Sequence, residues 1–265
     1  MKIGRTVRAV VAVGLVGAFV GCGQRGSGAG DTDPPARSET PRYASAERLP
    51  EKLSQDGTMI VVGNPAALST VQMYEDPRCP VVEEYERTGA EAVRKVLLTG
   101  EVKAEYTFAS FKDDGLGGDG SKRAVNALRA ALEKGKFVEY HAVLFANQPA
   151  VESSGGFTTA RLLKLAEEVP GLRDQAFDGA VRTMKYSSFV TASEQAYEHT
   201  GDDPSGPGTP TVVVNGYVVD GGLNGLLFDA DMFHRMVTDL HEHPDTWDSL
   251  YLPLKKVVEA KIAES

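Results

Sequence analysis

Residues 74–85 read Tyr-Glu-Asp-Pro-Arg-Cys-Pro-Val-Val-Glu-Glu-Tyr, and this stretch carries the strongest information about the fold. An apolar run, residues 69–74, precedes it and an amphipathic run begins at Pro80, which predicts a strand that leads into a helix. Proline suits the first helical position, because the N–H that it lacks would have no acceptor within the helix. Cys79 is therefore expected at the helix start, where free backbone N–H groups and the positive end of the helix dipole favour a thiolate.

A second informative stretch, residues 208–221, reads Gly-Thr-Pro-Thr-Val-Val-Val-Asn-Gly-Tyr-Val-Val-Asp-Gly. The apolar runs on either side of Asn215-Gly216 predict a two-stranded hairpin with a tight turn. Together, Cys79-Pro80 and the Gly-Thr-Pro ahead of this hairpin resemble the active-site segment and the cis-proline loop of thioredoxin-fold oxidoreductases, and of the DsbA-like branch in particular. The resemblance covers about residues 55–240.

This resemblance implies an α/β structure, namely a thioredoxin fold with a helical insertion, at about residues 121–201, between the third strand and the cis-proline strand. It also implies a cis Thr209–Pro210 bond, which would leave the Thr209 backbone free to pair with an extended peptide beside Cys79. Pro80, Thr209 and Pro210 are then expected to line the substrate groove, and Cys79 is the expected catalytic residue.

The chain departs from the family's Cys-x-x-Cys motif, because Val82 occupies the position of the second cysteine. A dithiol oxidase or reductase needs two sulfurs, since the second resolves the mixed disulfide formed by the first. Only Cys79 and Cys22 are present, and Cys22, if lipidated, would have no free thiol, so at most monothiol exchange is expected. The alternative is a non-catalytic module that holds a peptide or protein in the cis-proline groove. The residues leave both interpretations, and therefore enzymatic activity, open.

Charged neighbours do not decide between these interpretations. Arg78 and the helix start favour a thiolate at Cys79. Four nearby acids disfavour it, namely Glu75, Asp76, Glu83 and Glu84. We expect extracytoplasmic proteins or peptides as partners in either case, and a mixed disulfide or a dimer through Cys79 if the thiol reacts.

The N-terminus has the features of a bacterial lipoprotein signal. Residues 1–21 begin with basic side chains and continue into an uncharged run, residues 9–21, which is short for a transmembrane helix. Phe19-Val20-Gly21-Cys22 resembles a lipobox, which implies that Cys22 is lipidated and that the protein is anchored to the extracytoplasmic face of the cell membrane. Residues 22–45, rich in Gly, Ser, Pro and Thr, are expected to form a disordered tether, and residues 46–265 the folded domain.

Hydrophobic periodicity and turn residues predict the remaining elements. The expected strands are residues 58–63, 69–74 and 101–111, followed later by the hairpin. The expected helices are residues 46–53, 80–98, 122–134, 137–145, 161–169, 172–184, 189–197, 231–241 and 253–263. Thr159 is expected to cap the helix that begins near residue 161, and the glycine-rich acidic segment 113–121 is expected to be a solvated loop.

Composition and motifs exclude several functions. The chain has 265 residues, 42% hydrophobic and 25% charged, with a formal net charge of −9, which argues against nucleic-acid binding. The glycine-rich segment 115–120 is preceded by acids and does not indicate a dinucleotide site, so no cofactor is expected. No metal site is expected either, since His241 and His243 are two residues apart on a helix and point in different directions. His141 is expected on a polar helix face, with a position lining the family's groove as the alternative. Trp247 and Tyr251 are expected to cap the core.

Overall fold

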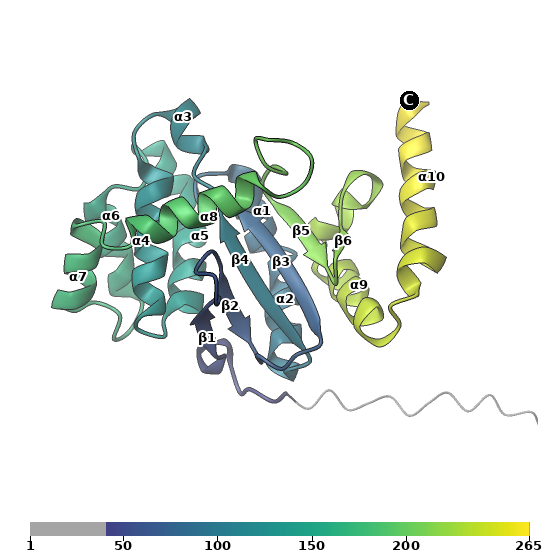
Figure 1. Cartoon of the computed structure of the whole chain (residues 1–265), viewed down its shortest axis with the longest axis horizontal. Helices are drawn as coiled ribbons and strands as arrows, with labels where there is room; N and C mark the ends of the chain where they lie inside the picture. Colours follow the sequence, from purple (N-terminus) through teal and green to yellow (C-terminus); the bar gives the residue numbers. More distant parts are fainter. Residues whose placement is uncertain (1–40, 265) are drawn as a thin grey trace, which may run out of the picture. The chain divides into compact units, whose positions relative to one another are not determined.

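The computed structural model describes residues 41–264, so the predicted signal peptide, the predicted lipidation site Cys22 and most of the predicted tether lie outside the described residues. The described strands form one mixed sheet of six, in the order β1-β2-β4-β3-β5-β6 (Figure 1). These are β1 Glu51–Leu53, β2 Ile60–Gly63, β3 Ser69–Glu75, β4 Val102–Phe108, β5 Thr211–Val214 and β6 Tyr217–Val218. Only β3 and β4 pair in parallel. The other pairs in the sheet are antiparallel.

The parallel pair β3 and β4 needs a crossover connection, and two helices supply it. They are α1 Pro80–Arg87 and α2 Ala90–Thr99, where the sequence predicted a single helix over residues 80–98. The break lies at Thr88-Gly89, because Thr88 leaves the helical region of the backbone. Gly89 is needed there because a Cβ atom would lie 1.8 Å from the carbonyl oxygen of Leu227.

The two faces of the sheet differ in what covers them. Helices α1, α2 and α9 (Ala230–Glu242) lie behind the sheet in Figure 1, and α2 packs against both α9 and β4. The alternation of β3 fits this arrangement, since Val71 and Met73 are buried whereas Thr70 and Gln72 are partly exposed. On the other face, α8 (Ser187–Glu198) crosses β4, and the Ser193 hydroxyl accepts a hydrogen bond from Phe108 N at 2.8 Å.

The predicted helical insertion lies between β4 and β5, which confirms the expected thioredoxin fold with inserted helices. Its helices are α3 Lys112–Leu116, α4 Gly120–Leu132, α5 Phe137–Ser153, α6 Thr159–Leu165, α7 Gln175–Arg182 and α8. Thr158, rather than Thr159, caps α6, because its side chain accepts a hydrogen bond from Arg161 N. The first helix after β4 is α3, Lys112–Leu116, which lies before the expected start of the insertion at about residue 121.

Two local predictions were wrong. Within residues 46–53 only Ala46–Arg48 forms a single 3-10 turn, and Glu51–Leu53 instead extends along β2 as an edge strand. The pairing also places the Glu51 carboxylate where it accepts hydrogen bonds from Phe137 N and Val138 N at the start of α5. The prediction of a solvated loop over residues 113–121 was wrong in part: residues 114–119 are exposed, but Lys112–Leu116 forms the short helix α3 and Asp113 is buried.

The C-terminal part packs onto the hairpin. A 3-10 helix, Gly221–Phe228, precedes α9, and a π-helical turn, Trp247–Tyr251, leads into α10 (Leu252–Ala263). Trp247 stacks on Tyr217 at 4.6 Å between ring centroids, and the Tyr251 hydroxyl donates to Asp239 at 2.7 Å. Both residues are buried in the core, as predicted. Within residues 41–264, no helix has the length and apolar character needed to cross a membrane.

Candidate thiol site

A turn after β3 places Cys79 at the start of α1. Asp76 makes this turn, because its backbone oxygen accepts from Cys79 N at 2.9 Å and its side chain accepts from Arg78 N at 2.9 Å. Pro80 then occupies the first turn of α1, and Cys79 is the residue before the helix, as the sequence predicted. The local chemistry of Asp-Pro-Arg-Cys-Pro therefore fixes the position of the thiol.

The cis-proline loop lies directly against this thiol. The Thr209–Pro210 peptide bond is cis. It lies just before β5, which pairs antiparallel with β3, so the end of one strand adjoins the start of the other. Cys79 Sγ lies 3.3 Å from the backbone oxygen of Thr209 and donates a hydrogen bond to it. The structure thus brings together three predicted site residues, Cys79, Thr209 and Pro210, from segments 130 residues apart.

The thiol itself is enclosed. Cys79 is 2% exposed and packs with Val82 and Phe145 in a small apolar cluster. Its side chain accepts no capping hydrogen bond from the backbone of α1, so the sulfur is a donor to Thr209 and not an acceptor from the helix start. Cys79 is the one free cysteine among the residues that the structure describes, and Val82 at the position of a resolving cysteine is fully buried.

The two acids that precede the thiol are engaged elsewhere. The Asp76 carboxylate accepts hydrogen bonds from the Ser121 hydroxyl at 2.6 Å and from Lys112 N at 2.9 Å, and burial raises its pKa to about 6. The Glu75 carboxylate is fully buried and bonds to His141. Asp76 therefore joins the thiol segment to the start of the helical insertion, a role that the sequence analysis missed.

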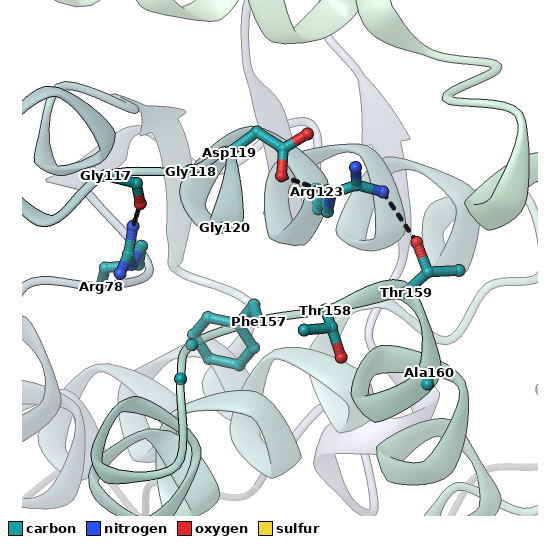
Figure 2. Close-up of a pocket in the computed structure, with 12 residues that line it drawn as sticks. Arg78, Gly117, Gly118, Asp119, Gly120, Arg123, Phe157, Thr158, Thr159 and Ala160 are labelled. Carbon is teal, nitrogen blue, oxygen red and sulfur yellow. Dashed lines mark hydrogen bonds and ion pairs between the residues drawn. The ribbon is translucent and has the colours of Figure 1, made fainter.

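Arg78 is likewise structural. Its guanidinium lies 2.9 Å from the Asp113 carboxylate and 3.1 Å from Glu152, and it donates to the Gly117 backbone oxygen at 2.9 Å. A cavity of about 450 Å³ lies beside it, between the segments 117–120 and 155–160. Figure 2 shows Arg78 pointing to Gly117 on one side of this cavity, and Arg123 between Asp119 and Thr159 on the other. The glycine-rich segment thus contacts Arg78 through Asp113 and the Gly117 oxygen, while residues 114–119 remain exposed.

A buried titratable cluster lies behind α1. Glu75 Oε2 and His141 Nε2 are 2.8 Å apart, and Glu86 Oε2 lies 3.1 Å from Arg94 Nη1. Burial raises the pKa of Glu75 to about 8 and that of Glu86 to about 7, and it lowers the pKa of His141. The expectation of His141 on a polar face was wrong, because this residue is 4% exposed. The spacing of Phe137, His141 and Phe145, four residues apart on one helix face, was the signal that could have revealed its burial.

Comparison with known proteins agrees with this geometry. A family model described as Thioredoxin matches residues 55–225, more than half of the chain. The chain belongs to the thioredoxin family. A search of curated protein sequences gives no significant match.

Solved structures with the same fold are DsbA-like proteins. One is MdbA, a thiol-disulfide oxidoreductase from Corynebacterium diphtheriae, 21% identical, with 67% of this chain and 91% of that chain covered and a TM-score of 0.55. Another is oxidised BdbD from Bacillus subtilis, 21% identical, with 72% and 96% covered and a TM-score of 0.57. A third is DsbA from Chlamydia trachomatis, 18% identical, with 79% and 98% covered and a TM-score of 0.55. At these identities the likeness establishes the fold, which is the DsbA-like fold that the sequence predicted.

Proposed function

We propose that this chain is a lipid-tethered thioredoxin-fold protein of the extracytoplasmic face, in which Cys79 carries out monothiol disulfide exchange. The observation that carries the proposal is the position of Cys79 at the start of α1, against Thr209 of the cis-proline loop. Pro80, Thr209 and Pro210 surround the point where a substrate disulfide would approach. The lipobox-like sequence that ends at Cys22 supports the anchor.

Monothiol exchange needs no second cysteine in the chain. The Cys79 thiolate attacks one sulfur of a substrate disulfide, a Cys79–substrate disulfide forms, and the other substrate sulfur leaves as a thiolate. A thiolate from a low-molecular-weight thiol then attacks the substrate sulfur of this mixed disulfide and restores Cys79. The incoming thiol ends in a disulfide with the substrate, so the protein is unchanged and no net oxidant is required. This scheme fits a chain that has Val82 where a resolving cysteine would lie.

A second candidate function is a non-catalytic module that holds an extended peptide or protein in the cis-proline groove. The burial of Cys79 and its hydrogen bond to the Thr209 oxygen favour this candidate, because the sulfur is screened from solvent and already engaged within the protein. In that case Cys79 packs as a small apolar residue with Val82 and Phe145.

The experiment that separates the two candidates compares the full-length protein with its Cys79→Ser variant. A peptide that carries a mixed disulfide with glutathione is incubated with each, and the release of glutathione and the formation of a protein–peptide adduct are followed by mass spectrometry. Exchange predicts that both signals require Cys79. A binding module predicts no adduct from either protein and equal affinity for the reduced peptide, and that result would exclude the exchange function. A disulfide-linked dimer that disappears in Cys79→Ser would show a reactive thiol and count for exchange.

A further inference from the structure

Three buried side chains behind the thiol segment form a compact cluster of potential metal ligands. Glu75 lies at the end of β3, Glu86 lies on α1 and His141 lies on α5. One ligand atom from each lies within 4.8 Å of the others, and all three residues are buried. Three separate elements thus supply a mixed carboxylate and imidazole set at one point.

Arg94 supplies positive charge to only one of the two carboxylates of the cluster. Among the residues that the structure describes, no other Lys or Arg side chain pairs with either carboxylate. Arg94 lies 3.1 Å from Glu86. The second oxygen of each carboxylate, Oε1 of Glu75 and Oε1 of Glu86, is buried without a hydrogen-bond partner in the described part of the chain. The hydroxyl of the fully buried Tyr85 also lacks a partner there. Buried charges and polar atoms in proteins are normally compensated, so this cluster requires either a proton or a further cation.

Both ring nitrogens of His141 face carboxylates of the cluster. Its Nε2 lies 2.8 Å from Glu75 Oε2, and its Nδ1 lies 3.7 Å from Glu86 Oε2. The two ring nitrogens point in different directions, so an ion bound by both Glu75 and His141 takes Nε2, and its binding replaces the hydrogen bond between these residues. Two ligands of a tetrahedral Zn²⁺ ion lie roughly 3.3 Å apart at the usual bond lengths, so this pair needs only a small separation to admit the ion.

A cavity adjoins one member of the cluster, Glu86. A cavity of about 250 Å³ lies between α1, α2 and α5, and Glu83, Glu86 and Arg94 are among its lining residues. Glu86 therefore borders the cavity, with Glu83 on the same helix. Cys79, Thr209 and Pro210 are not among the residues that line it, so the cavity is distinct from the groove beside the thiol.

We propose that Glu75, Glu86 and His141 bind a divalent transition-metal ion of the Zn²⁺ type, with an open position toward the cavity. Imidazole together with carboxylate suits Zn²⁺, whereas Mg²⁺ and Ca²⁺ prefer oxygen ligands alone. The ion supplies the charge that Arg94 alone does not provide. The site is separate from the thiol, so it is independent of whether Cys79 performs exchange, and it departs from the sequence-based expectation of no metal site.

The test is a titration of the full-length protein, stripped with a chelator, with ZnCl₂ in a calorimeter. We expect one Zn²⁺ per chain and a higher melting temperature with Zn²⁺ present. Glu86→Gln and His141→Gln should each weaken binding at least about tenfold. The neutral isostere Glu75→Gln, which removes a buried charge and keeps the side-chain shape, should lose the Zn²⁺-dependent rise in melting temperature.

Matched controls separate this site from adventitious binding. His243 is exposed just after α9, so His243→Gln should leave the affinity unchanged, and so should Cys79→Ser, since no thiol is among the ligands. A Co²⁺ complex of the protein should accordingly lack a thiolate-to-metal charge-transfer band. The proposal is overturned if the wild-type protein binds no Zn²⁺, or if His243→Gln abolishes binding while Glu86→Gln retains it.

Discussion

Replacement of Arg78 by methionine tests whether the segment 113–121 is held by a buried ion-pair network. Methionine keeps an unbranched apolar stem and removes the guanidinium, which contacts Asp113, Glu152 and the Gly117 oxygen. The Asp113 side chain is 1% exposed, so its charge would lose its cationic partner inside the protein.

The size of the effect follows from what each acid retains. Removal of one partner of a buried pair costs about 3–5 kcal/mol, because the remaining charge is uncompensated. Asp113 still accepts hydrogen bonds from Ser121 N at 2.8 Å and Lys122 N at 3.2 Å, and Glu152 is 21% exposed and can turn to solvent. Both facts reduce the cost, so we expect a loss of about 3 kcal/mol in the free energy of unfolding.

Equilibrium urea unfolding at pH 7 measures this loss. Trp247, the one tryptophan of the chain, is buried and reports unfolding by fluorescence. The matched control is Arg87→Met at the end of α1, because Arg87 is 67% exposed and lies 3.6 Å from Glu83. An exposed pair of this kind contributes at most about 0.5 kcal/mol.

A second variant makes the result diagnostic. In Arg78→Met/Asp113→Asn the orphaned charge is gone, so we expect the double variant to be more stable than Arg78→Met by about 1–2 kcal/mol. A loss below about 1 kcal/mol in Arg78→Met, similar to that of Arg87→Met, would refute the argument. Simple additivity of the two single changes would refute it as well, because partners in one network should couple.

Three further predictions follow from particular contacts. Gly89→Ala should destabilise the protein by about 2–3 kcal/mol in urea unfolding, since its Cβ would meet the Leu227 carbonyl oxygen, which is backbone and cannot rotate away. Val82→Cys should allow an internal disulfide with Cys79, because both lie in one cluster at the start of α1, so mild oxidation should remove two titratable thiols. In the chelator-treated protein, burial raises the pKa of Glu75 to about 8, so folding takes up a proton between pH 4.5 and 8. The free energy of unfolding should therefore fall as the pH rises through this range, by at most about 1.4 kcal/mol per pH unit, and Glu75→Gln should reduce this slope.

Each of these predictions has a control. Gly115→Ala should have little effect, because a Cβ atom there meets nothing within 4 Å. Val82→Ser tests whether loss of the valine, without a new sulfur, alters thiol oxidation, and we expect no internal disulfide. Glu84→Gln, an exposed change on the same helix as Glu86, should leave the pH slope unchanged. A steep slope that survives in Glu75→Gln would contradict the assignment of that proton to Glu75.

The elements that the sequence predicted correctly are those whose backbone geometry is set by a few neighbouring residues. A strand that leads through Asp-Pro-Arg-Cys-Pro into a helix and a Gly-Thr-Pro ahead of an Asn-Gly hairpin each specify backbone geometry over a few residues. The helix break at Gly89 was missed, because α1 and α2 both satisfy helical periodicity. What interrupts them is the close approach of Leu227, a residue far away in the sequence.

The sequence by itself therefore determined the thioredoxin family, the place of Cys79 at a helix start and the lack of a second cysteine next to it. Only the tertiary structure decided which charged residues are buried and what each one contacts. Arg78 finds its partners 35 and 74 residues away, and Glu75 meets His141 across 66 residues. The physical reason is that the sequence around a charged residue can look the same whether that residue lies on a solvated helix face or in a buried ion-pair network. Its partner and its protonation state depend on burial, which long-range packing alone sets.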